Sequence, residues 1–134
     1  FDVNVVDIDA AADGGIWAVD GKERLRIGPD GTALLRSEAP GSWRIASDGT
    51  WIGEGYADLL SGRFGPNKEQ RVVALRDDGT ILGLDGDGSP TLRVQLEDEV
   101  QPFIAAGDLD GDGRDELLIS SKDRGVATVE MELP

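Results

Sequence analysis

The chain has 134 residues, enough for one domain with a hydrophobic core, and it carries a formal net charge of −14. This acidity disfavours nucleic acids and anionic membrane surfaces as partners, because both need clustered Lys and Arg side chains. The sequence contains no Cys and no His. Disulfides, thiolate metal sites and the commonest general base are therefore excluded.

The apolar residues fall in short runs separated by Gly, Asp and Pro, and no stretch sustains a helical period. This pattern predicts an all-β fold. The runs are also far shorter than the roughly 18 apolar residues of a membrane span. The predicted strands, in chain order, are Val3–Val6, Ile16–Val19, Leu25–Ile27, Ala33–Leu35, Trp43–Ala46, Trp51–Gly53, Ala57–Leu60, Arg71–Leu75, Ile81–Leu84, Leu92–Leu96, Phe103–Ala106, Glu116–Ser120 and Val126–Met131.

The triplet Asp-Gly-Thr occurs three times between predicted strands, beginning at Asp30, Asp48 and Asp78. Asp-Gly is a strong hairpin signal, because the primed turns that suit twisted strands need positive φ angles. Trp43 and Trp51 flank the second triplet, where aromatic side chains can pair across a hairpin. We expect the Trp side chains to pack rather than to bind sugars. If one is exposed, Trp51 is the candidate.

Residues 107–119 combine an Asp-rich loop with the start of a strand. Asp108, Asp110 and Asp112 alternate along the loop, and Gly113 follows them. Carboxylates at alternate positions of a tight loop can converge on Ca²⁺, which takes about six to eight oxygen ligands. Gly113 permits the positive φ angle that folds the backbone around an ion. Carboxylates packed this closely repel one another unless a cation lies between them.

Two further oxygens complete the predicted ligand set. Counted from the first Asp, the backbone carbonyl of Arg114 stands at position seven and the carboxylate of Glu116 at position nine. An EF-hand would need a bidentate Glu at position twelve followed by a helix, whereas Ile119 stands there in a strand-like run. The alternative is an Asp/Gly turn that binds no metal. Asp115 is expected to be a solvated charge.

Weaker copies of this unit precede it in the chain. Residues 62–75 align with 107–120, but the three Asp positions hold other side chains, namely Arg63, Gly65 and Asn67. Residues 6–19 also align, and they retain only Asp7 and Asp9. We expect both loops, 7–15 and 63–71, to be structural or vestigial, and whether either retains ion binding stays open. The stretch 85–90 is half a calcium loop without a ninth-position acid, and we predict a turn there.

Residues 106–119 resemble the Asp-rich loop of FG-GAP/VCBS repeats, the calcium-binding β-propeller repeats of integrin α-subunits and many bacterial surface proteins. The resemblance implies one all-β domain, 1–134, made of about three propeller blades of antiparallel strands at residues 1–40, 41–98 and 99–134. In that family the loop joins two strands of a blade and carries Ca²⁺. The implied metal ligands here are the side chains of Asp108, Asp110, Asp112 and Glu116 and the backbone carbonyl of Arg114.

A propeller needs about four to eight blades to close. The resemblance therefore implies a partial propeller, or a fragment of a larger ring that another chain or the rest of a longer chain completes. The start at Phe1 rather than Met agrees with a processed chain or a piece of one. A compact β-sandwich is the alternative fold.

These features predict a non-catalytic calcium-binding module that binds protein or glycan, or serves as an assembly subunit of a larger complex. We expect no nucleic acid partner and no direct membrane insertion. No catalytic residue is predicted, because no candidate base stands out. A fragment of a propeller-type polysaccharide lyase or hydrolase is the alternative, since some pectin-backbone lyases resemble such propellers. The resemblance and the calcium requirement predict an extracytoplasmic location: periplasm, cell surface or secreted.

Overall fold

Strands make up nearly all the regular structure of the chain. The computed structural model describes residues 4–85, 88–96 and 99–134, and within them it contains four antiparallel sheets, none of them closed. The only helical element in that part of the chain is a short 3-10 turn, η1 (Pro66–Lys68). The predicted all-β class is thus confirmed. No helix among the described residues is long and apolar enough to cross a membrane.

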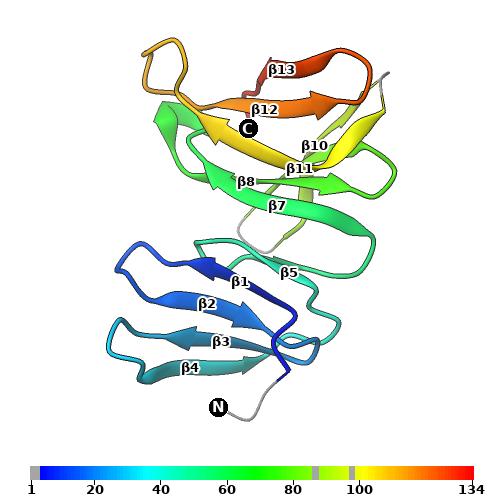
Figure 1. Ribbon diagram of the computed structural model, residues 1–134. Helices are drawn as coiled ribbons and strands as arrows, with labels where there is room; N and C mark the ends of the chain where they lie inside the picture. Colours follow the sequence, from blue (N-terminus) through cyan, green and yellow to red (C-terminus); the bar gives the residue numbers. More distant parts are fainter. Residues whose placement is uncertain (1–3, 86–87, 97–98) are drawn as a thin grey trace. The chain divides into compact units, whose positions relative to one another are not determined.

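The chain divides into two compact units, Phe1–Tyr56 and Ala57–Pro134. The first unit is coloured from blue to cyan-green in Figure 1, and the second from green to red. The single domain and the three blades expected from the sequence stay predictions.

The first unit is a four-stranded meander with a small hairpin. Its sheet has the order β1-β2-β3-β4, so each strand pairs with its neighbour in sequence. The strands are β1 (Asp7–Ala10), β2 (Ile16–Val19), β3 (Glu23–Ile27), β4 (Ala33–Glu38), and the hairpin strands β5 (Arg44–Ile45) and β6 (Trp51–Ile52). The Asp7 carboxylate accepts a hydrogen bond of 2.9 Å from the Ile45 backbone N–H, which joins β1 to the hairpin.

The second unit contains two further meanders. One sheet has the order β10-β9-β8-β7 and the other the order β11-β12-β13. The strands are β7 (Tyr56–Gly62), β8 (Arg71–Arg76), β9 (Thr80–Leu84), β10 (Pro90–Gln95), β11 (Val100–Gly107), β12 (Glu116–Ser121) and β13 (Gly125–Glu130). The loop 63–70 joins the first two strands of one meander, and the loop 108–115 joins the first two strands of the other. The two aligned segments therefore occupy equivalent places.

A shared hydrophobic core holds the two sheets of the second unit together. Side chains of β8 and β9 meet those of β11 and β12, and Phe64 lies fully buried among them. Burial of a large apolar side chain such as Phe64 stabilises a fold by about 1.5–3 kcal/mol. The Asp58 carboxylate on β7 adds a polar link, because it accepts a 2.9 Å hydrogen bond from the Ile104 N–H on β11. The core thus fixes the sheet that carries the Asp-rich loop.

The three Asp-Gly-Thr triplets form one kind of turn. In each, the Gly N–H donates to the carbonyl three residues earlier, and the Thr N–H donates to the Asp carboxylate at 2.9 Å. Only the Gly has a positive φ, at 84°, 85° and 84° for Gly31, Gly49 and Gly79. These are type I turns followed by a left-handed residue, so the expected primed turns were wrong. The hairpins themselves are confirmed.

One predicted strand lies in a different place. Residues 4–6 are not in a strand, and the first described strand is Asp7–Ala10. Its alternating burial comes from pairing with β2, where Asp7 opposes Val19 and Ala10 opposes Ile16. The strand was predicted at Val5 and Val6 because these residues are apolar, yet both are exposed.

Candidate metal centre

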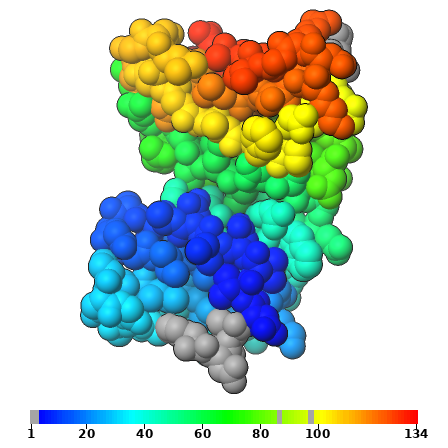
Figure 2. All heavy atoms as spheres, in the orientation of Figure 1, coloured from blue at the N-terminus to red at the C-terminus, as the bar shows by residue number. Residues whose placement is uncertain are grey.

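The Asp-rich loop brings four acidic side chains together. Asp108, Asp110 and Asp112 lie on the loop between β11 and β12, and Glu116 is the first residue of β12. One carboxylate oxygen from each lies within 4.8 Å of all the others. Figure 2 shows atoms of this loop, in gold, at the surface of the second unit. This is the only such acidic group among the residues that the structure describes.

Backbone N–H groups hold the first carboxylate of the loop. Asp108 accepts from the N–H of Gly111 at 2.8 Å and from the N–H of Gly113 at 2.9 Å, one on each oxygen. Both Gly residues have positive φ angles, 79° and 87°, as the fold of the loop requires. The positive φ angle predicted for Gly113 is thus confirmed. The chain curls around Asp108, which places the later carboxylates on the same side.

The next two Asp side chains make short-range turns of the same kind. Asp110 accepts from the N–H of Asp112 at 3.0 Å, and Asp112 accepts from the N–H of Arg114 at 2.8 Å. Each bond uses one lone pair of one carboxylate oxygen, and both side chains are exposed. The remaining oxygen lone pairs are available to a cation.

Glu116 links the end of the loop back to its beginning. The residue is only 7% exposed, and its carboxylate accepts a 2.6 Å hydrogen bond from the N–H of Leu109. This bond spans the loop from its exit back to its second residue. A buried carboxylate that faces three others is electrostatically costly without a compensating cation.

The electrostatics of the loop match this geometry. The N–H of Asp112 lowers the pKa of Asp110, but desolvation and the neighbouring Asp112 and Glu116 carboxylates raise it, so that its pKa lies above the ordinary 3.8. Desolvation alone would raise the pKa of Asp108, yet the N–H groups of Gly113 and Gly111 and the Arg63 charge hold it below that value. A set of four carboxylates is a hard oxygen donor set, suited to Ca²⁺, Mg²⁺ or Mn²⁺. The residues present therefore fit a divalent metal ion.

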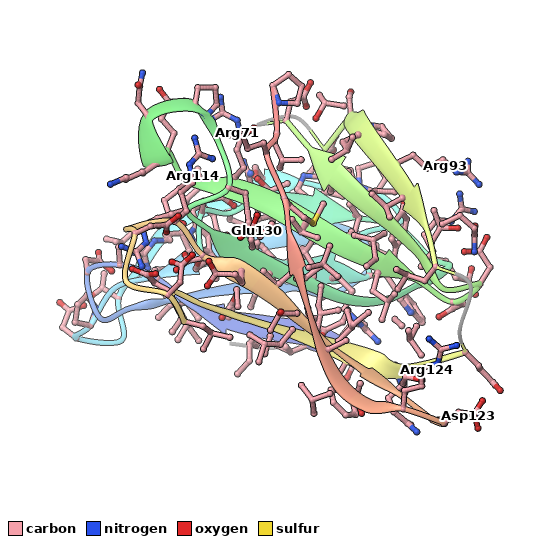
Figure 3. The ribbon with its side chains drawn as sticks, turned by 90° about the horizontal axis from the view of Figure 1, so that it is seen from above. Arg71, Arg93, Arg114, Asp123, Arg124 and Glu130 are labelled. Atoms are coloured by element: carbon pink, nitrogen blue, oxygen red, sulfur yellow. The ribbon has the colours of Figure 1, made fainter. Side chains whose placement is uncertain are left out.

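Arg114 directs its side chain away from the acidic group. Its guanidinium lies 3.5 Å from the Glu132 carboxylate beyond β13, and Figure 3 shows it near the loop end of the unit. Asp123 and Arg124 mark the opposite end, at the β12–β13 turn. The role of the Arg114 carbonyl as a metal ligand stays a prediction.

Asp115 is not a solvated charge, contrary to expectation. Its side chain is only 12% exposed, and the Arg63 guanidinium lies against it at 2.8 Å. The hydrogen bond from the Arg63 side chain is the main reason that the pKa of Asp115 lies below the ordinary 3.8. Sequence alternation alone could not show this, because the partner lies 52 residues away.

The two weaker copies of the loop do not assemble acids. Asp7 and Asp9 lie in strand β1, where Asp7 bonds the Ile45 N–H and Asp9 accepts from the Ala10 N–H at 2.8 Å. In the loop 63–71, Asn67 and Lys68 have left-handed backbone angles, φ 53° and 63°. Residues 86 and 87 of the predicted turn 85–90 lie outside the described residues, and beside them the N–H of Gly88 donates to the Asp85 carbonyl at 3.1 Å.

The Trp side chains are arranged differently from expectation. Trp43 is 39% exposed, while Trp51 is half-buried and opposes Ile45 rather than Trp43. Trp17 is half-buried, with the guanidinium carbons of Arg24 and Arg26 at 5.1 and 5.5 Å from its ring centroid. Such cation–π contacts stabilise the fold and cover the ring. Trp43, not Trp51, is the exposed one.

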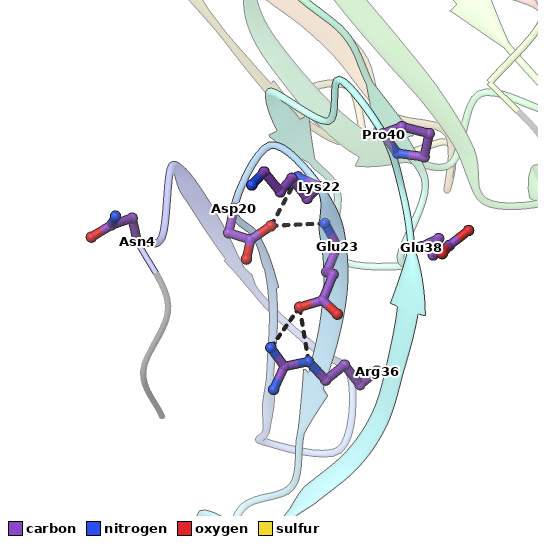
Figure 4. Close-up of a pocket in the computed structure, with 7 residues that line it drawn as sticks. All are labelled: Asn4, Asp20, Lys22, Glu23, Arg36, Glu38 and Pro40. Carbon is purple, nitrogen blue, oxygen red and sulfur yellow. Dashed lines mark hydrogen bonds and ion pairs between the residues drawn. The ribbon is translucent and has the colours of Figure 1, made fainter.

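The first unit also has an open hollow beside β3 and β4 (Figure 4). It is lined mainly by charged side chains, among them Asp20, Glu23 and Arg36. Arg36 pairs with Glu23 at 2.7 Å, and Asp20 accepts from the backbone N–H groups of Lys22 and Glu23 at 2.9 and 2.7 Å. The charged groups are thus engaged in this ion pair and these hydrogen bonds, so the hollow presents no site as well defined as the Asp-rich loop.

No protein-family model matches the chain, and neither does any curated protein sequence. Inference about function therefore starts from the geometry of the loop.

Proposed function

We propose that this chain is a non-catalytic calcium-binding module in which the ion stabilises the connection between β11 and β12. The convergence of four carboxylate oxygens within 4.8 Å carries this proposal. Ca²⁺ tolerates flexible coordination by carboxylates and carbonyls, whereas Mg²⁺ needs near-ideal octahedral geometry and keeps several waters. An exposed loop with four acids favours Ca²⁺. Asp108, Asp110, Asp112 and Glu116 would hold the ion, with the Arg114 carbonyl as the predicted fifth ligand.

The ion would act as a structural cross-link. Asp108 immediately follows β11 and Glu116 begins β12, so an ion bound by both ties the two strands at their loop end. Only the folded loop presents the four oxygens together. Calcium binding would therefore raise the free energy of unfolding by mass action.

The wider role that we propose is binding or assembly. The propeller interpretation is supported by three open meanders and by the equivalent position of the loops 63–70 and 108–115. Phe103 on β11 and Val126 on β13 are 55% and 70% exposed, which suits contact with another chain or with the rest of a longer one. Protein or glycan is the proposed partner class, and an extracytoplasmic location would supply calcium. The polysaccharide-lyase fragment stays the alternative hypothesis.

Calorimetric titration of the whole chain with CaCl₂ and, separately, with MgCl₂ tests the ion site. We expect one calcium to bind, and magnesium to bind at least tenfold more weakly. Asp110→Ala should abolish calcium binding, because it removes a ligand. Asp123→Ala is the matched control, since it removes one carboxylate at the far end of the sheet and should leave the affinity unchanged. Equal affinities in both variants, or none in the wild type, would refute the proposal.

The solution mass tests the assembly role. The chain has a mass of 14.2 kDa, and light scattering after size exclusion in calcium distinguishes a monomer from an assembly of copies. Self-assembly predicts a multiple of that mass, reduced to the monomer by Phe103→Asp. A monomer at all concentrations would exclude self-assembly and leave a glycan, a different chain or the rest of a longer chain as the partner.

A further inference from the structure

Arg63 makes an unusually complete set of contacts with the end of the Asp-rich loop. Its guanidinium donates to both oxygens of Asp115, at 2.8 Å through Nη2 and 3.3 Å through Nε. Its backbone N–H donates to the same carboxylate at 2.7 Å, and its carbonyl accepts from the Asp115 N–H at 3.4 Å. Two-pronged Arg–carboxylate contacts fix geometry as well as charge. The loop exit is thus anchored to the segment that follows β7.

The anchor lies directly beside the metal-ligating carboxylates. Asp115 precedes Glu116, whose buried carboxylate reaches back to the Leu109 N–H. A fixed Asp115 therefore fixes where Glu116 starts and where its side chain points. A second residue of the loop 63–70 also reaches the Asp-rich loop, because a Cβ added at Gly113 would lie 2.6 Å from the Lys68 ammonium nitrogen. The loop 63–70, which holds Arg63, Gly65 and Asn67 at the positions of the three Asp, thus packs along the Asp-rich loop.

We propose that Arg63 is a positioning residue for the cation site: by holding Asp115, it orders the Asp-rich loop before the ion arrives and so raises calcium affinity. This inference rests on the proposed calcium-binding function. The paired Asp115 is also unavailable as a competing ligand, which keeps the four converging oxygens as the site. Neighbours that orient metal ligands typically contribute about 10–100-fold to metal affinity.

Charge and positioning make opposite predictions for Arg63. Arg63 is a cation close to the loop, so its loss should strengthen calcium binding if it acts only through space. If it acts by positioning, its loss should weaken binding. The sign of the change in Arg63→Gln therefore separates the two mechanisms. Arg71→Gln is the matched control, because Arg71 starts β8 in the same segment but pairs with the exposed Glu69 at 3.0 Å.

The experiment combines calcium titration of the whole chain with amide hydrogen exchange in EDTA. We expect Arg63→Gln to bind calcium about tenfold more weakly and Arg71→Gln to bind like the wild type. Asp115→Asn should weaken calcium binding as well. The double variant Arg63→Gln/Asp115→Asn should bind calcium no more weakly than the single variant with the lower affinity, since the two side chains act as one contact. Without calcium, the amides of Leu109 and Gly113 should exchange about tenfold faster in Arg63→Gln, with β9 amides unchanged.

Each other outcome overturns the inference in a recognisable way. An unchanged or raised calcium affinity in Arg63→Gln would show that Arg63 does not position the site. Equal weakening in Arg71→Gln would show that the effect is not specific to the Arg63–Asp115 contact, and faster exchange throughout β9 would show general loss of structure. If the wild type bound no calcium, the proposed function would fail and the positioning role with it, whereas failure in the variants alone overturns only the role of Arg63.

Discussion

At the scale of single residues, Gly31 and Gly49 occupy the same place in two identical turns but have different surroundings. Both have φ near 85°, at 84° and 85°. A Cβ at Gly31 would meet no atom within 4 Å, whereas a Cβ at Gly49 would lie 2.7 Å from the Trp17 ring. We expect Gly31→Ala to lower the free energy of unfolding by about 1–2 kcal/mol, from backbone strain alone.

Gly49→Ala should cost about 1–3 kcal/mol more than Gly31→Ala, because the ring of Trp17 must move away from its contact with the turn. Urea denaturation of both variants measures the difference, and Gly31→Ala serves as the control for strain. Equal costs would mean that Trp17 does not pack on the turn as described.

Asp13 gives a prediction about pH. The Arg26 side chain is the main cause that lowers the pKa of Asp13 below the ordinary 3.8, with help from the Gly15 N–H. A carboxylate with a lowered folded-state pKa contributes stability above its unfolded pKa and loses it as the pH falls through the folded value. We expect Asp13→Asn to be less stable than the wild type at pH 6 in EDTA, and the difference to vanish well below pH 3.8. A difference independent of pH would contradict this ionic role.

The acidic cluster of the loop could be predicted from sequence, because the spacing of its members is local. Asp108, Asp110 and Asp112 recur at alternate positions within a few residues of Glu116, and the structure brings all four together. The pairing of Asp115 with Arg63 could not be predicted in this way, since it joins residues 52 positions apart. Local spacing shows which carboxylates can converge. Only the tertiary structure shows which neighbouring carboxylate is paired with a cationic side chain.

At the scale of elements, the charge of Asp110 in the Asp-rich loop should lower the free energy of unfolding without calcium and raise it with calcium. Without a cation, the ionised Asp110 is repelled by Asp112 and Glu116, and these neighbours contribute to its raised pKa. Asp110→Asn keeps the oxygen that accepts the Asp112 N–H but removes the charge. We expect this variant to be more stable than the wild type in EDTA and less stable in millimolar CaCl₂. Urea unfolding in the two buffers measures both differences.

The matched control for that comparison is Asp123→Asn, at the turn far from the loop. Its stability relative to the wild type should be the same in both buffers. A variant Asp110→Asn that loses stability equally in EDTA and in calcium would indicate a purely structural turn.

Strand positions were predictable where apolar residues are buried, and less so at edges. β8 and β9 lie in the core and match the predicted runs closely. β1 is a half-exposed edge strand of alternating acids and apolar residues, so its place is set by pairing with β2 rather than by its own composition. The turn type was also missed, because the Asp-Gly pair suits both a primed turn and a type I turn with a following left-handed Gly.

At the scale of the whole molecule, composition and spacing predicted the all-β class and the place of the acidic loop. They could not predict the division into Phe1–Tyr56 and Ala57–Pro134, because this depends on which buried faces meet. In the second unit the buried sheet faces pack together, because β8 and β9 share a core with β11 and β12. The Asp-rich loop joins β11 and β12 of this core, so a bound ion should stabilise the unit as a whole.

Thermal unfolding of the whole chain in EDTA and in millimolar CaCl₂ tests the central claim most directly, with Asp110→Ala and Asp123→Ala beside the wild type. A calcium concentration 100-fold above the dissociation constant should stabilise the folded chain by about 2.7 kcal/mol, a rise of several degrees in Tm. We predict this rise for the wild type and Asp123→Ala, and its loss in Asp110→Ala. A Tm that is the same in EDTA and in calcium would contradict the account and leave the loop as a turn without an ion.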